Sequence, residues 1–158
     1  MTTRIEDRGN FSGAWKAILG LEGYVRETGL ETILLDLVRL RASQMNGCAY
    51  CLSMHTRDLL KLGERPDRIA VLPAWRESDW FTDRERAALA WTEALTDLST
   101  REVPDAVFDQ ARSIFSEKEL ADLTLAVIAI NGWNRINVGF QNPPDPFPSE
   151  LKQPAMAQ

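Results

Sequence analysis

The chain has 158 residues, of which 44% are hydrophobic and 26% charged, and its formal net charge is −5. This length predicts one domain with a sizeable core, and the acidic balance argues against a nucleic-acid-binding module, which normally shows a clustered basic surface. The first ten residues lack the apolar run of a secretory signal, and the uncharged stretch 123–134 is shorter than the about 18 apolar residues that span a bilayer. We therefore expect a soluble cytoplasmic protein.

Helical spacing of apolar residues runs through the first half of the chain. The segment 11–28 shows a loose helical pattern, and the apolar residues of 30–44 follow the i, i+3, i+4, i+7, i+8 rule of an amphipathic helix. An Asn-Gly pair after the second segment is a stop signal. It places Cys48 in the first turn of the next predicted helix, 48–62.

The second half of the chain contains two capping boxes, Thr82 with Glu85 and Ser116 with Glu119, which predict helix starts. The helices expected in this half are 82–98, 104–114 and 120–140. Because no segment alternates between apolar and polar residues with a period of two, strands are not expected. The predicted fold class is all-α.

Prolines gather at the end of the chain. Five of the eight prolines lie within 143–158, and proline cannot continue a helix. We expect a single all-α domain over 1–142 and an extended proline-rich tail over 143–158. The simple interpretation is a frayed tail; the alternative is an arm that packs on a neighbouring subunit through Phe147.

Both cysteines and the only histidine of the chain, Cys48, Cys51 and His55, lie within eight residues. Their i, i+3 and i+7 spacing places them on one stripe of the predicted helix. An i, i+3 pair of thiols is close enough to form a disulfide with little movement. The start of a helix favours a thiolate, because its free backbone N–H groups and dipole stabilise negative charge.

Three interpretations of this cluster remain open on the residues alone. The first is a redox-active dithiol with His55 assisting proton transfer. The second is a metal site in which Cys48, Cys51 and His55 are three ligands and water or Asp36 is the fourth. The third is two small buried cysteines and a hydrogen-bonded core histidine. The spacing favours the redox interpretation.

The stretch DLVRLRASQMNGCAYCLSMH, from Asp36 to His55, closely resembles the active-site signature of AhpD-like alkylhydroperoxidases in the carboxymuconolactone decarboxylase superfamily. The likeness covers most of 30–140 and includes 75–78, 82–98 and 130–135. It implies an all-α fold, no cofactor and assembly as a trimer or hexamer. It also implies a thiol-dependent peroxidase, and some members of the family are reduced by a lipoylated partner.

The resemblance also implies a role for each residue of the motif. Cys51 matches the thiol that attacks the hydroperoxide, and Cys48 matches the more accessible thiol that resolves the sulfenic acid to a disulfide. His55 matches the histidine of the proton relay. Asp36 stands where the family has a glutamate; its shorter side chain predicts a bridging water and a weaker peroxidase. Tyr50 stands where some members carry a second relay histidine, and a phenol is a poor base at neutral pH.

Two charged residues of 30–44 can be judged independently of the resemblance. Asp36 lies at the border of the apolar stripe, so it is either a solvated surface carboxylate or a carboxylate that faces the cysteine helix and orients His55. Arg41 lies inside the stripe, where an unpaired guanidinium would be costly. We expect Arg41 to pair with an internal or intersubunit carboxylate.

The remaining candidates are aromatic and polar residues outside the motif. Four aromatic residues are expected in the core or an interface: Trp75, Trp80, Phe81 and Trp91. Three residues interrupt the most apolar helix and suggest an inter-helix hydrogen-bond network: Trp133, Asn134 and Arg135. The function predicted overall is reduction of a hydroperoxide by an external dithiol. A metal-dependent enzyme and a non-catalytic redox sensor are the alternatives.

Overall fold

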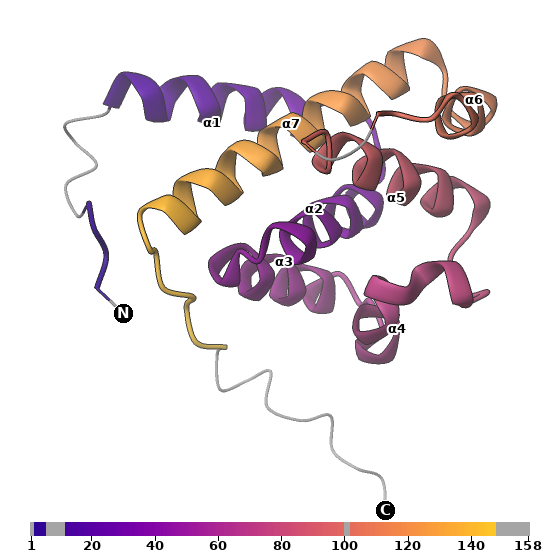
Figure 1. Ribbon diagram of the computed structural model, residues 1–158. Coiled ribbons are helices and arrows are strands. Elements are labelled where there is room, and N and C mark those ends of the chain that lie inside the picture. The colour runs from indigo at the N-terminus through magenta and orange to yellow at the C-terminus, as the bar shows by residue number, and fades with distance from the viewer. Residues whose placement is uncertain (1, 6–11, 100–101, 148–158) are drawn as a thin grey trace, which may run out of the picture.

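The computed structural model describes residues 2–5, 12–99 and 102–147, which form helices and connecting loops without a strand (Figure 1). The helices are α1 (Ser12–Arg26), α2 (Thr32–Asn46), α3 (Ala49–Lys61), α4 (Pro66–Val71), the 3₁₀ helix η2 (Leu72–Glu77), α5 (Asp83–Thr96), α6 (Asp105–Ile114) and α7 (Glu117–Gly139). The predicted all-α class is confirmed. No helix in the part of the chain described is long and apolar enough to cross a bilayer.

The two predicted capping boxes form as expected. Thr82 is the N-cap of α5, and its side chain accepts from the backbone N–H of Glu85 while the Glu85 side chain accepts from the backbone of Thr82. Ser116 and Glu119 make the same reciprocal pair at the start of α7. Each box satisfies two backbone donors that the first turn would otherwise leave unpaired.

The boundary between α2 and α3 differs slightly from the prediction. The helix expected over 30–44 runs over Thr32–Asn46, and Gly47 ends it with φ 64°, in the left-handed region where glycine carries no Cβ penalty. Cys48 is the N-cap of α3 rather than a residue of its first turn, because its backbone is extended (φ −85°, ψ 96°). The first cysteine therefore lies just before the helix and the second lies in its first turn.

Helix α2 occupies the centre of the bundle and packs against α3, α5 and α7 (Figure 1). One apolar cluster lies between α2, α5, α6 and α7, and another lies between α2, α3, η2 and α5. Nine of the fifteen residues of α2 are buried, including the charged Asp36 and Arg39. Because buried charges must be paired, these two side chains need partners inside the protein.

Helix α1 lies across α7 at the edge of the bundle (Figure 1). Val25 is its one buried residue, and Leu19 is 55% exposed. Two side-chain contacts attach α1 to α7. The indole of Trp15 stacks on Trp133 with centroids 5.6 Å apart, and the hydroxyl of Tyr24 donates to Asp122 over 2.8 Å.

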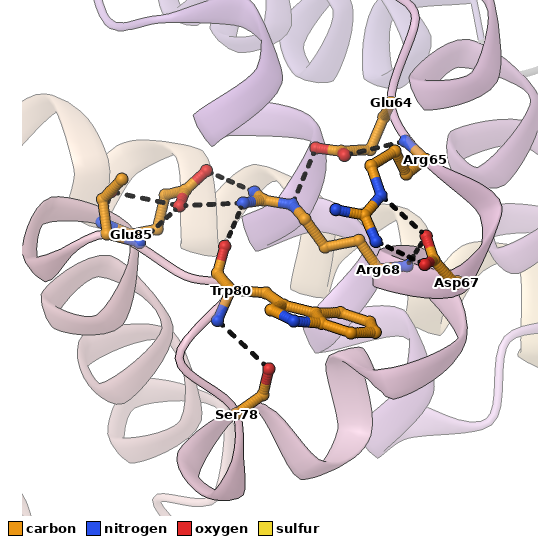
Figure 2. Close-up of polar contacts among 8 residues, drawn as sticks. Glu64, Arg65, Asp67, Arg68, Ser78, Trp80 and Glu85 are labelled. Carbon is orange, nitrogen blue, oxygen red and sulfur yellow. Dashed lines mark hydrogen bonds and ion pairs between the residues drawn. The ribbon is translucent and has the colours of Figure 1, made fainter.

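The connection from α4 to α5 is held by the partly buried Arg68 (Figure 2). Its guanidinium pairs with Glu64 over 3.1 Å and with Glu85, and it donates to the backbone carbonyl of Trp80 over 2.6 Å. Arg65 lies over the Trp80 ring, 4.9 Å from its centroid. Since Glu85 also closes the capping box of α5, this cluster fixes α4 to the start of α5.

Three of the four aromatic residues expected in the core or an interface are buried: Trp75, Phe81 and Trp91. The fourth, Trp80, is 41% exposed on this chain. The predicted internal partner of Arg41 is Glu93, with Nε and Oε1 2.7 Å apart. The same carboxylate accepts from the indole nitrogen of Trp75 over 2.8 Å, so one half-buried acceptor joins α2, η2 and α5.

Residues 143–147 follow α7 without regular secondary structure, as expected for a proline-rich segment. The hydroxyl of Ser53 donates to the backbone carbonyl of Asp145 over 2.9 Å, which holds this segment against α3. Phe147 is 40% exposed. The rest of the predicted tail, 148–158, lies outside the described residues.

Candidate active site

The turn between α2 and α3 positions the two cysteines. After Gly47 the backbone N–H of Cys48 donates to the carbonyl of Ser43 over 3.1 Å, which closes the end of α2. As N-cap of α3, Cys48 has a side-chain acceptor directed at the free N–H groups of the first turn, and its Sγ accepts from the backbone N–H of Cys51 over 3.4 Å. This local geometry brings both sulfurs to the same end of α3.

The two free thiols form a hydrogen-bonded pair. Their Sγ atoms are 2.7 Å apart, within hydrogen-bond distance of each other. This hydrogen bond lowers the pKa of Cys48 to about 7, opposed by burial and assisted by the backbone N–H of Cys51. The same contact, together with burial, raises the pKa of Cys51. The pair therefore loses its first proton more readily from Cys48 than from Cys51.

His55 lies one turn after Cys51 on α3 and meets Asp36 of α2. Its Nδ1 is 3.3 Å from Asp36 Oδ1, and both side chains are buried. The interpretation of Asp36 as a solvated surface group is therefore wrong, and the alternative, that it faces the cysteine helix beside His55, is confirmed. The distance between the two groups leaves no room for the predicted bridging water. Among the described residues neither ring nitrogen of His55 has a well-aligned hydrogen-bond partner.

Asp36 belongs to a longer chain of buried charges. Its Oδ1 accepts from Arg39 over 3.1 Å, and Arg39 also pairs with Glu22 of α1 over 2.7 Å. Burial would raise the pKa of Asp36, but the hydrogen bonds and charges of His55 and Arg39 outweigh it and hold this pKa below its ordinary value. Asp36 is therefore an ionised carboxylate beside the imidazole at neutral pH.

A cavity of about 590 Å³ lies between α1, α2, α3 and α7. Its polar lining includes Asp36, His55 and Asn137, and its apolar lining includes the stacked indoles of Trp15 and Trp133. The cavity is large enough for a small organic ligand, and its wall combines apolar side chains with charged and polar ones. Two residues of the sequence motif, Asp36 and His55, thus line a cavity.

Neither sulfur lines this cavity. Cys48 is 1% exposed and Cys51 0% exposed, in a cluster with Ala42 and Ile130 on which the partly buried side chains of Tyr50 and Trp133 pack. The family resemblance implies that Cys48 is the more accessible thiol. This is wrong for this chain, because the N-cap position turns the Cys48 sulfur into the junction of α2, α3 and α7.

The predicted polar network on α7 forms between helices. Asn134 donates to the hydroxyl of Ser43 over 3.0 Å and accepts from Asn46 over 2.9 Å, which ties α7 to the end of α2. Arg135 is exposed and bonds Asn131 of its own helix, and Trp133 lines the cavity. The inter-helix network is confirmed for Asn134.

Sequence reasoning did not identify Asn137, which contacts the Cys51 sulfur. Its Nδ2 lies 3.4 Å from that sulfur, across 86 positions of sequence. The available signal was a third asparagine in the last turns of the most apolar helix. Arg39 was also missed, although its place three residues after Asp36 puts both on one face of α2.

The described residues contain no group of three or more His, Cys, Asp or Glu side chains placed to hold a metal ion. The sulfurs meet each other and amide groups, while His55 meets Asp36. This arrangement gives the metal-site interpretation no geometric support.

Comparison with known proteins gives one family and one fold. A model of the carboxymuconolactone decarboxylase family matches residues 11–94. The uncharacterized protein YdfG of Bacillus subtilis is 38% identical over 127 residues, covering 80% of this chain and 86% of YdfG. A crystal structure from Agrobacterium tumefaciens is described as a protein of unknown function and a candidate antioxidant defence protein AhpD. It has a TM-score of 0.88 at 40% identity, covering 92% of this chain and 100% of that one.

A more distant structure from Ralstonia eutropha is described as an alkylhydroperoxidase AhpD core. It has a TM-score of 0.75 at 18% identity, covering 87% of this chain and 74% of that one. At this identity the likeness shows the fold alone.

Proposed function

The chain belongs to the carboxymuconolactone decarboxylase family and has an AhpD-like helical fold, and from that premise we propose that it is a thiol-dependent peroxidase. The observation that carries the proposal is the pair of thiols in contact at the start of α3, one turn from the buried His55–Asp36 pair. The low-pKa Cys48 thiolate supplies the base that takes the proton of Cys51, and a paired imidazole supplies a proton donor and acceptor.

In the first step, the Cys48 thiolate accepts the proton of Cys51 along their hydrogen bond, which leaves Cys51 as the attacking thiolate. The Cys51 sulfur forms a bond to the terminal peroxide oxygen, and the O–O bond breaks. The departing alkoxide takes a proton from His55, which Asp36 holds in place. The products of this step are the Cys51 sulfenic acid and an alcohol.

In the second step, Cys48 returns its proton to His55 and attacks the Cys51 sulfenic acid. A disulfide forms, and the hydroxide that leaves takes that proton to become water. In sum, two thiols and one hydroperoxide give one disulfide, one alcohol and one water. An external dithiol then reduces the disulfide and restores both thiols.

The burial of both sulfurs sets a condition on this cycle. Hydroperoxide entering the cavity reaches the polar groups of His55 and Asn137 before either sulfur, since these side chains line the cavity and the sulfurs do not. Attack therefore requires movement of the covering side chains, Tyr50 and Trp133. We extend the proposal to a dithiol reductant such as a lipoylated protein, to a trimeric or hexameric assembly and to a cytoplasmic location.

The test of the proposal compares wild-type protein with Cys51→Ser and Cys48→Ser, using excess dithiothreitol and cumene hydroperoxide. Wild-type protein is expected to turn over, Cys51→Ser to consume no hydroperoxide, and Cys48→Ser, assayed without dithiothreitol, to complete one turnover and accumulate a sulfenic acid that dimedone traps. Unchanged consumption by Cys51→Ser refutes the assignment of the attacking thiol. If Cys48→Ser is inert and Cys51→Ser instead forms a sulfenic acid on Cys48, Cys48 is the attacking thiol. Disulfide formation without turnover, accompanied by a change in oligomeric state, identifies a redox sensor instead.

A further inference from the structure

Asn137 lies between the cavity and the Cys51 sulfur. It is buried near the end of α7, its side chain lines the cavity, and its Nδ2 donates to Cys51 Sγ over 3.4 Å. The Cys48 thiol and the Asn134 amide are the other side chains that act on this sulfur as hydrogen-bond partners among the described residues. Asn137 therefore contacts the Cys51 sulfur, the atom that attacks the hydroperoxide in the proposed function.

The orientation of the Asn137 amide is set by two further hydrogen bonds. Its Nδ2 also donates to the carbonyl of Trp133 over 3.0 Å, and its Oδ1 accepts from the side chain of Asn142 over 2.8 Å. With the carbonyl oxygen engaged by a donor, the NH₂ group is the end of the amide that faces the sulfur. Asn142 thus selects the donor face of Asn137 for Cys51.

The end of α7 brings Asn142 into this position. Gln141 has φ 56°, in the left-handed region, and the backbone N–H of Asn142 donates to the carbonyl of Asn137 over 3.0 Å. This reversal of the chain places residue 142 back against the last turns of the helix. The two asparagines therefore form a unit produced by the helix terminus.

We propose that Asn137 is a catalytic residue of this site, whose side-chain N–H holds the Cys51 sulfur as it becomes a thiolate and attacks, and that Asn142 is the residue that orients it. The proposal rests on the proposed peroxidase function. An N–H group aimed at a sulfur gains strength as negative charge develops there, so it favours the thiolate over the thiol. In agreement, the Asn137 amide, together with that of Asn134, acts to lower the pKa of Cys51, against the larger effects of Cys48 and burial that raise it.

The experiment isolates Cys51 from its partner. In a Cys48→Ser background Cys51 is the only cysteine of the chain, so the pH dependence of its alkylation by iodoacetamide gives the pKa of one thiol. Asn137→Asp keeps the size of the side chain but replaces the N–H donor with an acceptor. We expect it to raise the pKa of Cys51 by at least about one unit. At a pH well below that pKa, such a rise makes the thiolate fraction about tenfold smaller. Asn142→Ala leaves the amide present but free to turn, and a rise about half as large is expected.

Asn131 of the same helix provides a matched control. Its side chain donates to the carbonyl four residues earlier, Val127, over 3.0 Å, as Asn137 does to Trp133, but it makes no contact with either sulfur. Asn131→Asp is expected to leave the pKa of Cys51 unchanged. Asn137→Asp adds a carboxylate beside the sulfur, whereas Asn142→Ala leaves the titrating groups close to the cavity, His55 and Asp36 with Arg39 and Glu22, unchanged. Asn142→Ala therefore reports on the Asn137 amide alone.

The outcomes separate this inference from the proposed function. A pKa of Cys51 that is unchanged in both Asn137→Asp and Asn142→Ala overturns the inference, even where the wild-type protein turns over hydroperoxide. If Asn137→Asp does not fold, as shown by circular dichroism, Asn142→Ala alone decides it. Wild-type protein without peroxide turnover refutes the proposed function, while the alkylation series still shows whether Asn137 holds the sulfur. The single-turnover rate of sulfenic acid formation is expected to fall about tenfold in Asn137→Asp and by less than twofold in Asn131→Asp.

Discussion

Replacing Asp36 with asparagine removes one charge from the centre of the proposed site at almost constant volume. Asp36 Oδ1 lies 3.3 Å from the His55 imidazole and 3.1 Å from the Arg39 guanidinium. The asparagine side chain would retain a hydrogen-bond acceptor but carry no negative charge for the guanidinium or the imidazole to face. We expect the variant to lose stability and to react more slowly with hydroperoxide. The two losses have different causes and different magnitudes.

The stability loss follows from the ion pairs. Arg39 keeps Glu22 at 2.7 Å, so its guanidinium is not left unpaired, and the loss is close to that of one hydrogen bond to a charged group, about 1.5–3 kcal/mol. A fall of about 2 kcal/mol lowers Tm by about 4–8 °C in a domain of this size. The pKa of Asp36 is lowered in the folded protein. Ionised Asp36 therefore contributes to the free energy of unfolding above the pKa of aspartate in the unfolded chain, about 3.9, and this contribution is lost as the pH falls below it. Wild-type and variant stabilities are expected to converge in acid.

The loss in reactivity follows from the proton transfer. A positioned acid–base group typically contributes 10²–10⁴-fold, so we expect the second-order rate constant for hydroperoxide to fall about 100-fold in Asp36→Asn. Stopped-flow measurement of the peroxide step and urea unfolding report the two effects separately. Asp122→Asn is the matched control, because Asp122 is also buried and bonded, to Tyr24 over 2.8 Å and Lys118 over 2.6 Å, but lies outside the cavity lining. The control should lose stability and keep its rate; a rate within threefold of wild type in Asp36→Asn refutes the proton relay.

Three further predictions concern the thiolate, the core and the cavity wall. Absorbance at 240 nm should show one thiolate per chain titrating near pH 7, rising with pH, and Cys48→Ser should abolish this titration; its persistence would assign the low pKa elsewhere. Glu93→Gln, which weakens an acceptor shared by two arginines and an indole, should lower the free energy of unfolding by about 2–3 kcal/mol, and an unchanged urea midpoint would contradict this. Trp15→Ala removes the stack on Trp133, worth about 0.5–1.5 kcal/mol. It should raise KM for cumene hydroperoxide several-fold while leaving the reaction with hydrogen peroxide unchanged, and equal effects on both would argue against an apolar substrate wall.

The helices could be read from the sequence because their signals are local. The capping boxes at Thr82 and Ser116 and the left-handed Gly47 each act within a few residues, and the predicted ends agree with the structure to within about three residues. The grouping of Cys48, Cys51 and His55 at one end of α3 was equally local. The position of Cys48 as N-cap differs by one residue, because the chain reversal at Gly47 leaves the next residue extended.

The surroundings of those residues could not be predicted from local sequence signals in the same way. The sequence left Asp36 either solvated or facing the cysteine helix, and the crossing of α2 and α3 decided between the two. Burial of both sulfurs was one of the alternatives that the sequence left open, and it was decided by Ile130 and Trp133, which pack on the cysteines from α7. Periodicity identifies the apolar side of a helix, but it does not state which helix packs there.

By itself, then, the sequence determined which residues are candidates for the proposed chemistry: two thiols and an imidazole at helical spacing, which any helix would align. Only the tertiary structure decided how that chemistry is tuned and reached. It placed the Asp36 carboxylate beside His55, closed both sulfurs off from the 590 Å³ cavity, and brought Asn137 against Cys51 from 86 positions away. The physical reason is that pKa and access depend on burial and on partners from other helices, and these arise from how α1, α2 and α7 cross α3.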